Sequence, residues 1–295
     1  HLCGRVGRCL SFLKPSLYIN EGFFGYLYLM YMNYEHSYLI EIQYLGFRFH
    51  GWQKQTNSMS LHEMIDKTLS FSLKNIPFKS IGMSRTDSKV SANQYYFQIF
   101  LNDILDDAFL EVFNQNAPQD LRVKRIQKVT VNFNIIQANK IKEYHYYFSL
   151  EKNNHPFAAS LMTAFEDLDI EKMKIAAIKF KGKHHFHKYC TKPSPNTRFE
   201  RIIEECEIVK NNLLDASFFP DLSFIFKVKG KGFLRYQIRL MMAMLVEIGA
   251  GRKTLEQLIQ SISFENDRKP LKNIAPASGL QLYAVEFDDL NKYLL

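Results

Sequence analysis

Hydrophobic and polar positions change their spacing several times along the chain, and each change marks a predicted element. From Tyr38 the sequence YLIEIQY alternates apolar and polar side chains, which predicts a half-buried strand. From Leu61 onward, leucine and isoleucine recur every four residues behind Ser60–Glu63, which has the spacing of a capping box. A helix is therefore predicted to follow this first strand.

The same analysis of the rest of the chain predicts an order of elements that occurs twice. Strands are predicted at residues 77–81, 95–101, 121–133, 144–150, 201–210, 222–229 and 282–287, and helices at 104–115, 170–180, 233–248 and from 254. The order is βαββαβ, repeated with one extra helix. We expect an α+β protein of two ferredoxin-like halves, 33–132 and 133–295, forming a broad antiparallel sheet with a basic central cleft. Residues 1–32 are interpreted as a non-functional N-terminal extension.

Composition narrows the class of partner. The chain of 295 residues is 46% hydrophobic and carries a formal charge of +8, which favours a nucleic acid as partner, with an acidic membrane surface as second choice. The apolar run Phe23–Met32 is too short to cross a bilayer, so no membrane association is expected. The four cysteines form no CxxC pair, which suits free thiols in a reducing, cytoplasmic compartment.

The stretch Ile81–Ala92 is the candidate for catalysis. It places Asp87 on a polar loop between two predicted strands, where a rigid scaffold can present a carboxylate to a ligand. An ordinary turn is the alternative, because Ser and Asp favour turns. Arg235 and Arg239 are four residues apart on the predicted helix 233–248, and either could lower the pKa of Asp87 and aim its carboxylate. Tyr144 could stack on an unpaired base or belong to the core.

Two further segments carry polar side chains of interest. The loop Gly46–Gln55 interleaves Arg48, Trp52 and Lys54, which suits phosphate contact and base stacking, although Trp52 could equally anchor the loop in the core. The segment Lys183–Cys190 holds three histidines and a cysteine but has no matching second cluster, so it is interpreted as a polar loop and no metal site is expected.

Six segments in this order resemble the TruA-type tRNA pseudouridine synthases. They are YLGFRFHGWQKQ at 44–55, LHEMIDKTL at 61–69, SRTDSKVSA at 84–92, KEYHYYF at 142–148, GKGFLRYQIRLMMAMLVEIGAG at 230–251 and APASGLQLYAVEF at 275–287. The sequence departs from the family pattern in the loop around Asp87. Ser84 stands where the family commonly has Gly, and Ser88-Lys89-Val90-Ser91 replaces Ala-Gly-Val-His. Leu45 replaces an aspartate.

The resemblance implies a function and a site. Asp87 corresponds to the catalytic aspartate, Tyr144 to the tyrosine that stacks on the target base, and Arg239 to the arginine that pairs with the aspartate. The implied reaction is isomerisation of uridine in tRNA to pseudouridine, expected in the anticodon stem-loop, by a homodimer with no metal or cofactor. Residues expected to bind substrate are Arg85, Arg48, Trp52, Lys54, Arg235 and Phe233.

Two alternatives to this enzyme remain open at the level of sequence. The altered loop around Asp87 is compatible with an RNA-binding protein of the same fold that has lost catalysis. A carboxylate-dependent hydrolase is the third interpretation, and it is disfavoured because no second catalytic acid is found.

Overall fold

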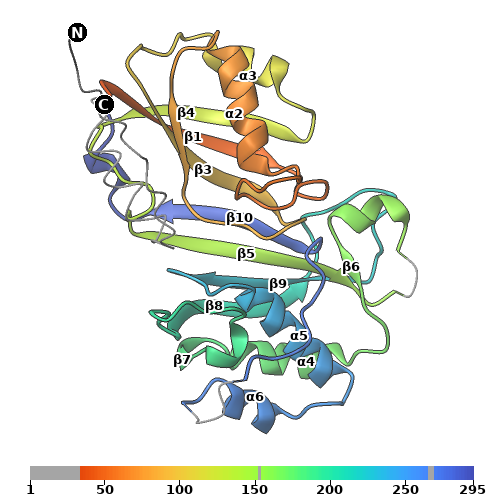
Figure 1. The fold of residues 1–295 in the computed structure, drawn as a ribbon. Helices are drawn as coiled ribbons and strands as arrows, with labels where there is room; N and C mark the ends of the chain where they lie inside the picture. Colours follow the sequence, from red (N-terminus) through yellow and green to blue (C-terminus); the bar gives the residue numbers. More distant parts are fainter. Residues whose placement is uncertain (1–33, 152–153, 265–268) are drawn as a thin grey trace, which may run out of the picture. The chain divides into compact units, whose positions relative to one another are not determined.

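A large mixed sheet with five α-helices dominates the part of the chain that the structure describes (Figure 1). The computed structural model describes residues 34–151, 154–264 and 269–295. The sheet and its helices belong to the unit Glu35–Leu295, and the predicted extension at 1–32 lies outside the described residues. The fold is α+β, as expected. None of the helices among these residues is long and apolar enough to cross a membrane.

The predicted elements are present in the predicted order. The strands are β1 His36–Tyr44, β2 Lys79–Gly82, β3 Ser91–Leu101, β4 Leu121–Val129, β5 Lys140–Ser149, β6 Thr163–Ala164, β7 Gly182–His185, β8 Glu200–Lys210, β9 Ser223–Gly230 and β10 Leu280–Phe287. The α-helices are α2 Leu61–Ser72, α3 Phe109–Asn116, α4 Ile170–Ile178, α5 Gln237–Gly249 and α6 Leu255–Ser261.

The order of strands in the sheet explains why distant parts of the sequence meet. Its main path runs β4-β1-β3-β10-β5-β9-β8-β7, with β2 paired to β3 and β6 to β5 (Figure 1). Neighbours on this path are antiparallel except β10 and β3, which run parallel through only two residue pairs, Gln281 with Ser91 and Leu282 with Ala92. The loop that carries Asp87 ends at Ser91. It therefore reaches the sheet where the last strand of the chain joins the early ones.

The apolar positions that alternate along β1 and recur at helical spacing in α2 are buried in the core, as predicted. Ile40 and Ile42 of β1 are fully buried, and so are Ile65 and Leu69 of α2. Each such side chain contributes about 1.5–3 kcal/mol through burial. The hydroxyl of Ser60 accepts a hydrogen bond from the backbone N–H of Glu63 at 3.3 Å and caps α2.

Three predictions about local structure were wrong. Helix α3 begins at Phe109 rather than at residue 104. Helix α5 begins at Gln237 rather than at residue 233, because Tyr236 has a left-handed backbone with φ 63° that no helix can continue through. Arg235 therefore precedes the helix and does not share a helical face with Arg239. The histidine-rich segment Lys183–Cys190 was expected to be a loop, but its first residues belong to β7 at the edge of the sheet, where His184 pairs with Arg201 of β8, and His187–Tyr189 form a short 3-10 helix. Edge strands tolerate polar side chains, so the alternation there is weak.

Candidate active site

The loop at residues 83–90 holds Asp87 in a tight, hydrogen-bonded conformation between β2 and β3. The hydroxyl of Tyr95 donates to the carbonyl of Ser84 at 2.6 Å. The N–H of Val90 donates to the carbonyl of Asp87 at 3.2 Å, and Lys89 between them has φ 66°. These bonds fix the backbone on both sides of the carboxylate.

A second loop, from Gly46 to Gln55, packs against the first and fixes it from outside. The N–H of Lys89 donates to the carbonyl of Phe49 at 3.0 Å, and the N–H of Trp52 donates to the carbonyl of Thr86 at 3.2 Å. Between them Gly51 has φ 87°, and a Cβ placed there would lie 2.5 Å from the oxygen of Thr86. Only glycine fits so close to the backbone that carries Asp87.

Trp52 belongs to the core rather than to a ligand-binding surface. Its side chain is 3% exposed and stacks between His62 at 4.9 Å and Tyr95 at 4.4 Å, measured between ring centroids. A Cβ at Gly82 would lie 2.3 Å from its ring. Both faces of the indole are covered, so it offers no face on which a base could stack. The expectation that Trp52 binds substrate is corrected in favour of the alternative, a core anchor.

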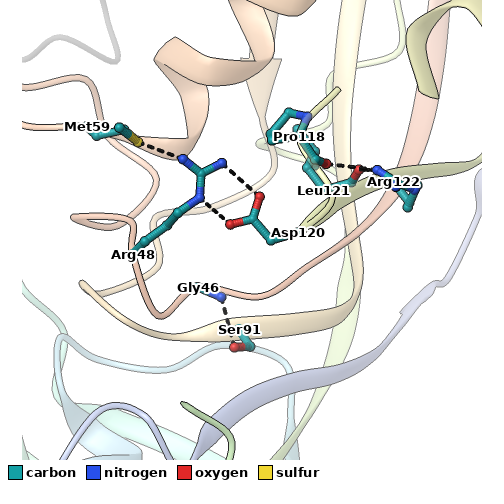
Figure 2. A network of polar contacts seen from close by, with 8 residues as sticks. All are labelled: Gly46, Arg48, Met59, Ser91, Pro118, Asp120, Leu121 and Arg122. Carbon is teal, nitrogen blue, oxygen red and sulfur yellow. Dashed lines mark hydrogen bonds and ion pairs between the residues drawn. The ribbon is translucent and has the colours of Figure 1, made fainter. Parts of the chain in front are cut away.

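Arg48 and Lys54 also have roles within the protein. Figure 2 shows the guanidinium of Arg48 held by both carboxylate oxygens of Asp120, with one bond of 2.8 Å from Nη2 to Oδ1. Its Nη1 contacts the sulfur of Met59 at 3.0 Å. Lys54 forms an ion pair with Asp66. Neither side chain lines the pocket that contains Asp87, so the structure does not bring these two predicted substrate contacts to it.

The pairing of Asp87 with Arg239 joins residues that are 152 apart in the sequence. Arg239 Nη1 lies 3.3 Å from Asp87 Oδ2, and Arg239 Nε donates to the carbonyl of Ala275 at 2.8 Å. The side chains of Asp87 and Arg239 are 24% and 15% exposed, so the carboxylate is open to a ligand on one side. The arginine is thus held by the backbone and in turn orients the carboxylate.

The electrostatic balance at Asp87 differs from the one expected. Burial raises the pKa of Asp87 above its usual value, and the positive charges of Arg239 and, more weakly, Arg235 offset only part of that rise. The sequence had suggested a net lowering by arginine. Desolvation is the larger effect because the carboxylate lies below the surface of a pocket.

That pocket has a volume of about 720 Å³ and collects six of the predicted site residues. Its lining includes Asp87, Arg85, Tyr144, Phe233, Arg235 and Arg239. Tyr144 is 9% exposed, and the edge of its ring meets Phe233 with centroids 5.2 Å apart. Burial, with smaller effects from Tyr44 and Asp87, raises the pKa of the Tyr144 hydroxyl, which therefore stays protonated. The pocket combines a carboxylate, aromatic rings and positively charged side chains from segments far apart in the sequence.

Some lining residues were not anticipated. The ring of Tyr236 contacts two guanidinium groups, with Cζ of Arg235 5.3 Å and Cζ of Arg239 5.0 Å from its centroid. Lys142 also lines the pocket, and strand alternation could have identified it, since it stands two residues before Tyr144. Nothing in the hydrophobic pattern marks Tyr236. Its position depends on the left-handed turn before α5.

Comparison with known proteins places the chain in a family. Residues 176–288 match the family model described as tRNA pseudouridine synthase. The chain is 32% identical to tRNA pseudouridine synthase A of Oenococcus oeni over 262 residues, covering 86% of this chain and 99% of that protein. It is also 32% identical to the protein of the same name from Fervidobacterium nodosum, covering 84% and 98% of the two chains.

The chain belongs to the tRNA pseudouridine synthase A family. It is a pseudouridine synthase, an isomerase, and the resemblance inferred from the six sequence segments is confirmed. Within the described residues, no three His, Cys, Asp or Glu side chains converge as ligands for a metal ion. Cys190 and Cys206 are free and buried, and the other two cysteines lie outside the described residues.

Proposed function

We propose that this synthase converts uridine to pseudouridine in the anticodon stem-loop of tRNA and that Asp87 is its catalytic carboxylate. The observation that carries the proposal is the Asp87–Arg239 pair, in which a partly exposed carboxylate is aimed into a pocket by an arginine from a distant element. The names of the related proteins support tRNA as the substrate class. The net charge of +8 suits binding to its phosphates.

The pocket can supply what the isomerisation requires. The target uridine leaves its stack and enters the pocket, where the rings of Tyr144 and Phe233 offer apolar contact for the base. Asp87 acts as the nucleophile at a carbon of the sugar or base while the bond from C1′ to N1 breaks. The uracil turns, C5 bonds to C1′, the bond between Asp87 and the carbon it attacked breaks, the proton on C5 is lost and N1 gains a proton. The product is an isomer of the substrate, and its atoms balance without a co-reactant.

The proposal includes the organisation of the chain. The strand orders β4-β1-β3-β2, with α2 and α3, and β10-β5-β9-β8, with α4, α5 and α6, support two ferredoxin-like halves at 33–132 and 133–295. The pocket draws Asp87 from the first half and Arg239 from the second, which supports a basic cleft between them. A cytoplasmic homodimer completes the proposal, on the family resemblance and the free thiols.

Replacing Asp87 tests the proposed chemistry. We expect the wild-type protein to form pseudouridine in a uridine-containing tRNA, detected as adducts of carbodiimide that resist alkali. The substitution Asp87→Asn keeps size and shape but removes the charge, so it should abolish turnover while tRNA affinity stays within a few fold. Mapping the adducts on the tRNA then tests the stem-loop. Wild-type protein that binds tRNA without forming pseudouridine would instead identify an inactive RNA-binding member of the fold.

A further inference from the structure

Strand β5 presents a second side chain beside Tyr144 in the pocket. Lys142 stands two residues before Tyr144, so both lie on the same face of the strand, and both line the pocket with Asp87. In the sheet Lys142 lies opposite Gly230 of β9 and Val285 of β10. Neither neighbour carries a charge, and the glycine has no side chain.

Lys142 differs from the other lysine of this strand in having no partner. Among the residues that the structure describes, no hydrogen bond or ion pair engages its ammonium group. Lys140 instead donates to the carbonyls of Ile135, Ile136 and Ala138 at 2.7, 3.1 and 2.9 Å. Burial, with a smaller contribution from Lys140, lowers the pKa of Lys142 to about 8. A half-buried ammonium without a counterion is unfavourable, so the site favours an anion from outside the chain.

We propose that Lys142 binds a backbone phosphate of the RNA beside the target uridine. The inference rests on the proposed function, because a uridine that enters the pocket brings its flanking phosphates with it. Lysine suits this contact as a compact positive charge that needs no planar partner. The guanidinium of Arg239 is already occupied by Asp87 and by the carbonyl of Ala275, so it cannot neutralise a phosphate without releasing them.

A phosphate contact has consequences that a proton-transfer role for Lys142 does not share. The contact forms in the bound substrate and persists in the transition state, so its loss should raise KM and leave kcat unchanged. Each phosphate neutralised by a cation adds about 0.7–0.9 to the slope of log affinity against log salt. An anion beside Lys142 also raises the pKa of its ammonium, so binding of RNA above pH 8 should take up a proton.

Three variants separate these roles. Lys142→Met keeps the length of the side chain without its charge, Lys142→Arg keeps the charge but cannot accept a proton, and Lys179→Met is the control. Lys179 is exposed at the end of α4 and does not line the pocket. We expect Lys142→Met to raise KM for tRNA roughly 10-fold or more and to reduce the salt slope by about 0.7–0.9, with kcat within about two-fold of wild type. Lys142→Arg should recover most of the affinity, and Lys179→Met should behave as wild type.

The outcomes that overturn the inference are distinct. Unchanged affinity and salt slope in Lys142→Met would exclude a phosphate contact. An equal loss of kcat in Lys142→Met and Lys142→Arg with KM unchanged would identify Lys142 as a proton acceptor instead. The Asp87→Asn variant keeps Lys142, so calorimetric titration of this variant with tRNA near pH 8.5, in two buffers of different ionisation enthalpy, measures proton uptake on binding. Absence of proton uptake also overturns the inference. Affinity and proton uptake do not require turnover, so a failure of the proposed function would be seen separately as absence of pseudouridine.

Discussion

Gly51 offers the clearest way to disturb Asp87 without touching substrate or the carboxylate. At Gly51 the backbone is left-handed, with φ 87°, and a Cβ would lie 2.5 Å from the carbonyl oxygen of Thr86, the residue before Asp87. Real Cβ atoms do not approach backbone oxygens so closely, so Gly51→Ala must displace one loop by at least several tenths of an ångström. The two loops are also joined by the bond from Trp52 N–H to Thr86. The displacement therefore reaches Asp87 directly.

Two costs follow from the substitution, and they can be measured separately. Adding a Cβ at a left-handed residue costs about 1–2 kcal/mol of stability, which corresponds to a fall in Tm of about 2–4 °C for each kcal/mol in a chain of this size. Misplacing a catalytic group by about 1 Å can cost about 100-fold in rate. We expect Gly51→Ala to lower kcat about 10-fold to 100-fold while tRNA affinity changes little.

Gly251 supplies the matched control for this experiment. It has φ 71° just beyond α5, and a Cβ there would meet no atom within 4 Å. Gly251→Ala should therefore lose only the stability that a Cβ on a left-handed backbone costs, with no displaced loop and no change in kcat. Pseudouridine formation measured at saturating tRNA, together with thermal melting, compares the two variants. Equal kcat for Gly51→Ala and Gly251→Ala would refute the view that contact with the 46–55 loop positions Asp87.

Two further predictions concern the same loop and its arginine. Arg239→Gln removes a positive charge that lowers the pKa of Asp87, so the pKa should rise further. If Asp87 reacts ionised, the acidic limb of the pH profile of kcat/KM should move to higher pH, and Arg239→Lys should move it less. An acidic limb that stays in place in both variants would exclude control of the Asp87 pKa by this pair. Lys89→Gly relieves the left-handed strain at φ 66°, so this variant should be about 1 kcal/mol more stable to denaturant than Lys89→Ala, with equal activity. A glycine variant that is less stable than the alanine variant would contradict the claim that Lys89 is strained.

The sequence predicted elements whose periodicity is strong, and it failed where a single residue decides the backbone. The alternation in β1 and the leucine spacing of α2 reflect burial directly, so these elements appear where expected. The start of α5 was missed because a tyrosine adopts a left-handed conformation, for which its residue type gives no signal. The two-residue strand β6 is too short to show any period.

For the candidate site, too, some predictions agree with the structure and others do not. Residues found through motif order, such as Asp87, Tyr144 and Arg239, do meet in one pocket, because the parallel contact of β3 and β10 joins the early and late parts of the chain. The basic and aromatic loop at 46–55 was interpreted as a surface for RNA from its composition. Composition cannot show that Arg48 is held by Asp120, or that His62 and Tyr95 cover both faces of Trp52, since these partners lie outside the loop.

The 46–55 loop holds the backbone beside Asp87, and its residues His50, Gln53 and Gln55 line the pocket, so its contacts bear on the altered sequence around Asp87. Lys89 occupies the place where the family pattern commonly has glycine, yet it keeps a glycine-like backbone, and its N–H still bonds to Phe49 of the neighbouring loop. Ser91, in place of histidine, accepts a hydrogen bond from the N–H of Gly46 at 2.9 Å (Figure 2). The bond from Lys89 is made by backbone atoms and does not depend on its side chain, whereas the bond from Gly46 uses the hydroxyl of Ser91 itself. These bonds hold the backbone on both sides of Asp87 with Lys89 and Ser91 in place, and the carboxylate is paired with Arg239 in the pocket, which favours an active enzyme over an inactive RNA-binding protein.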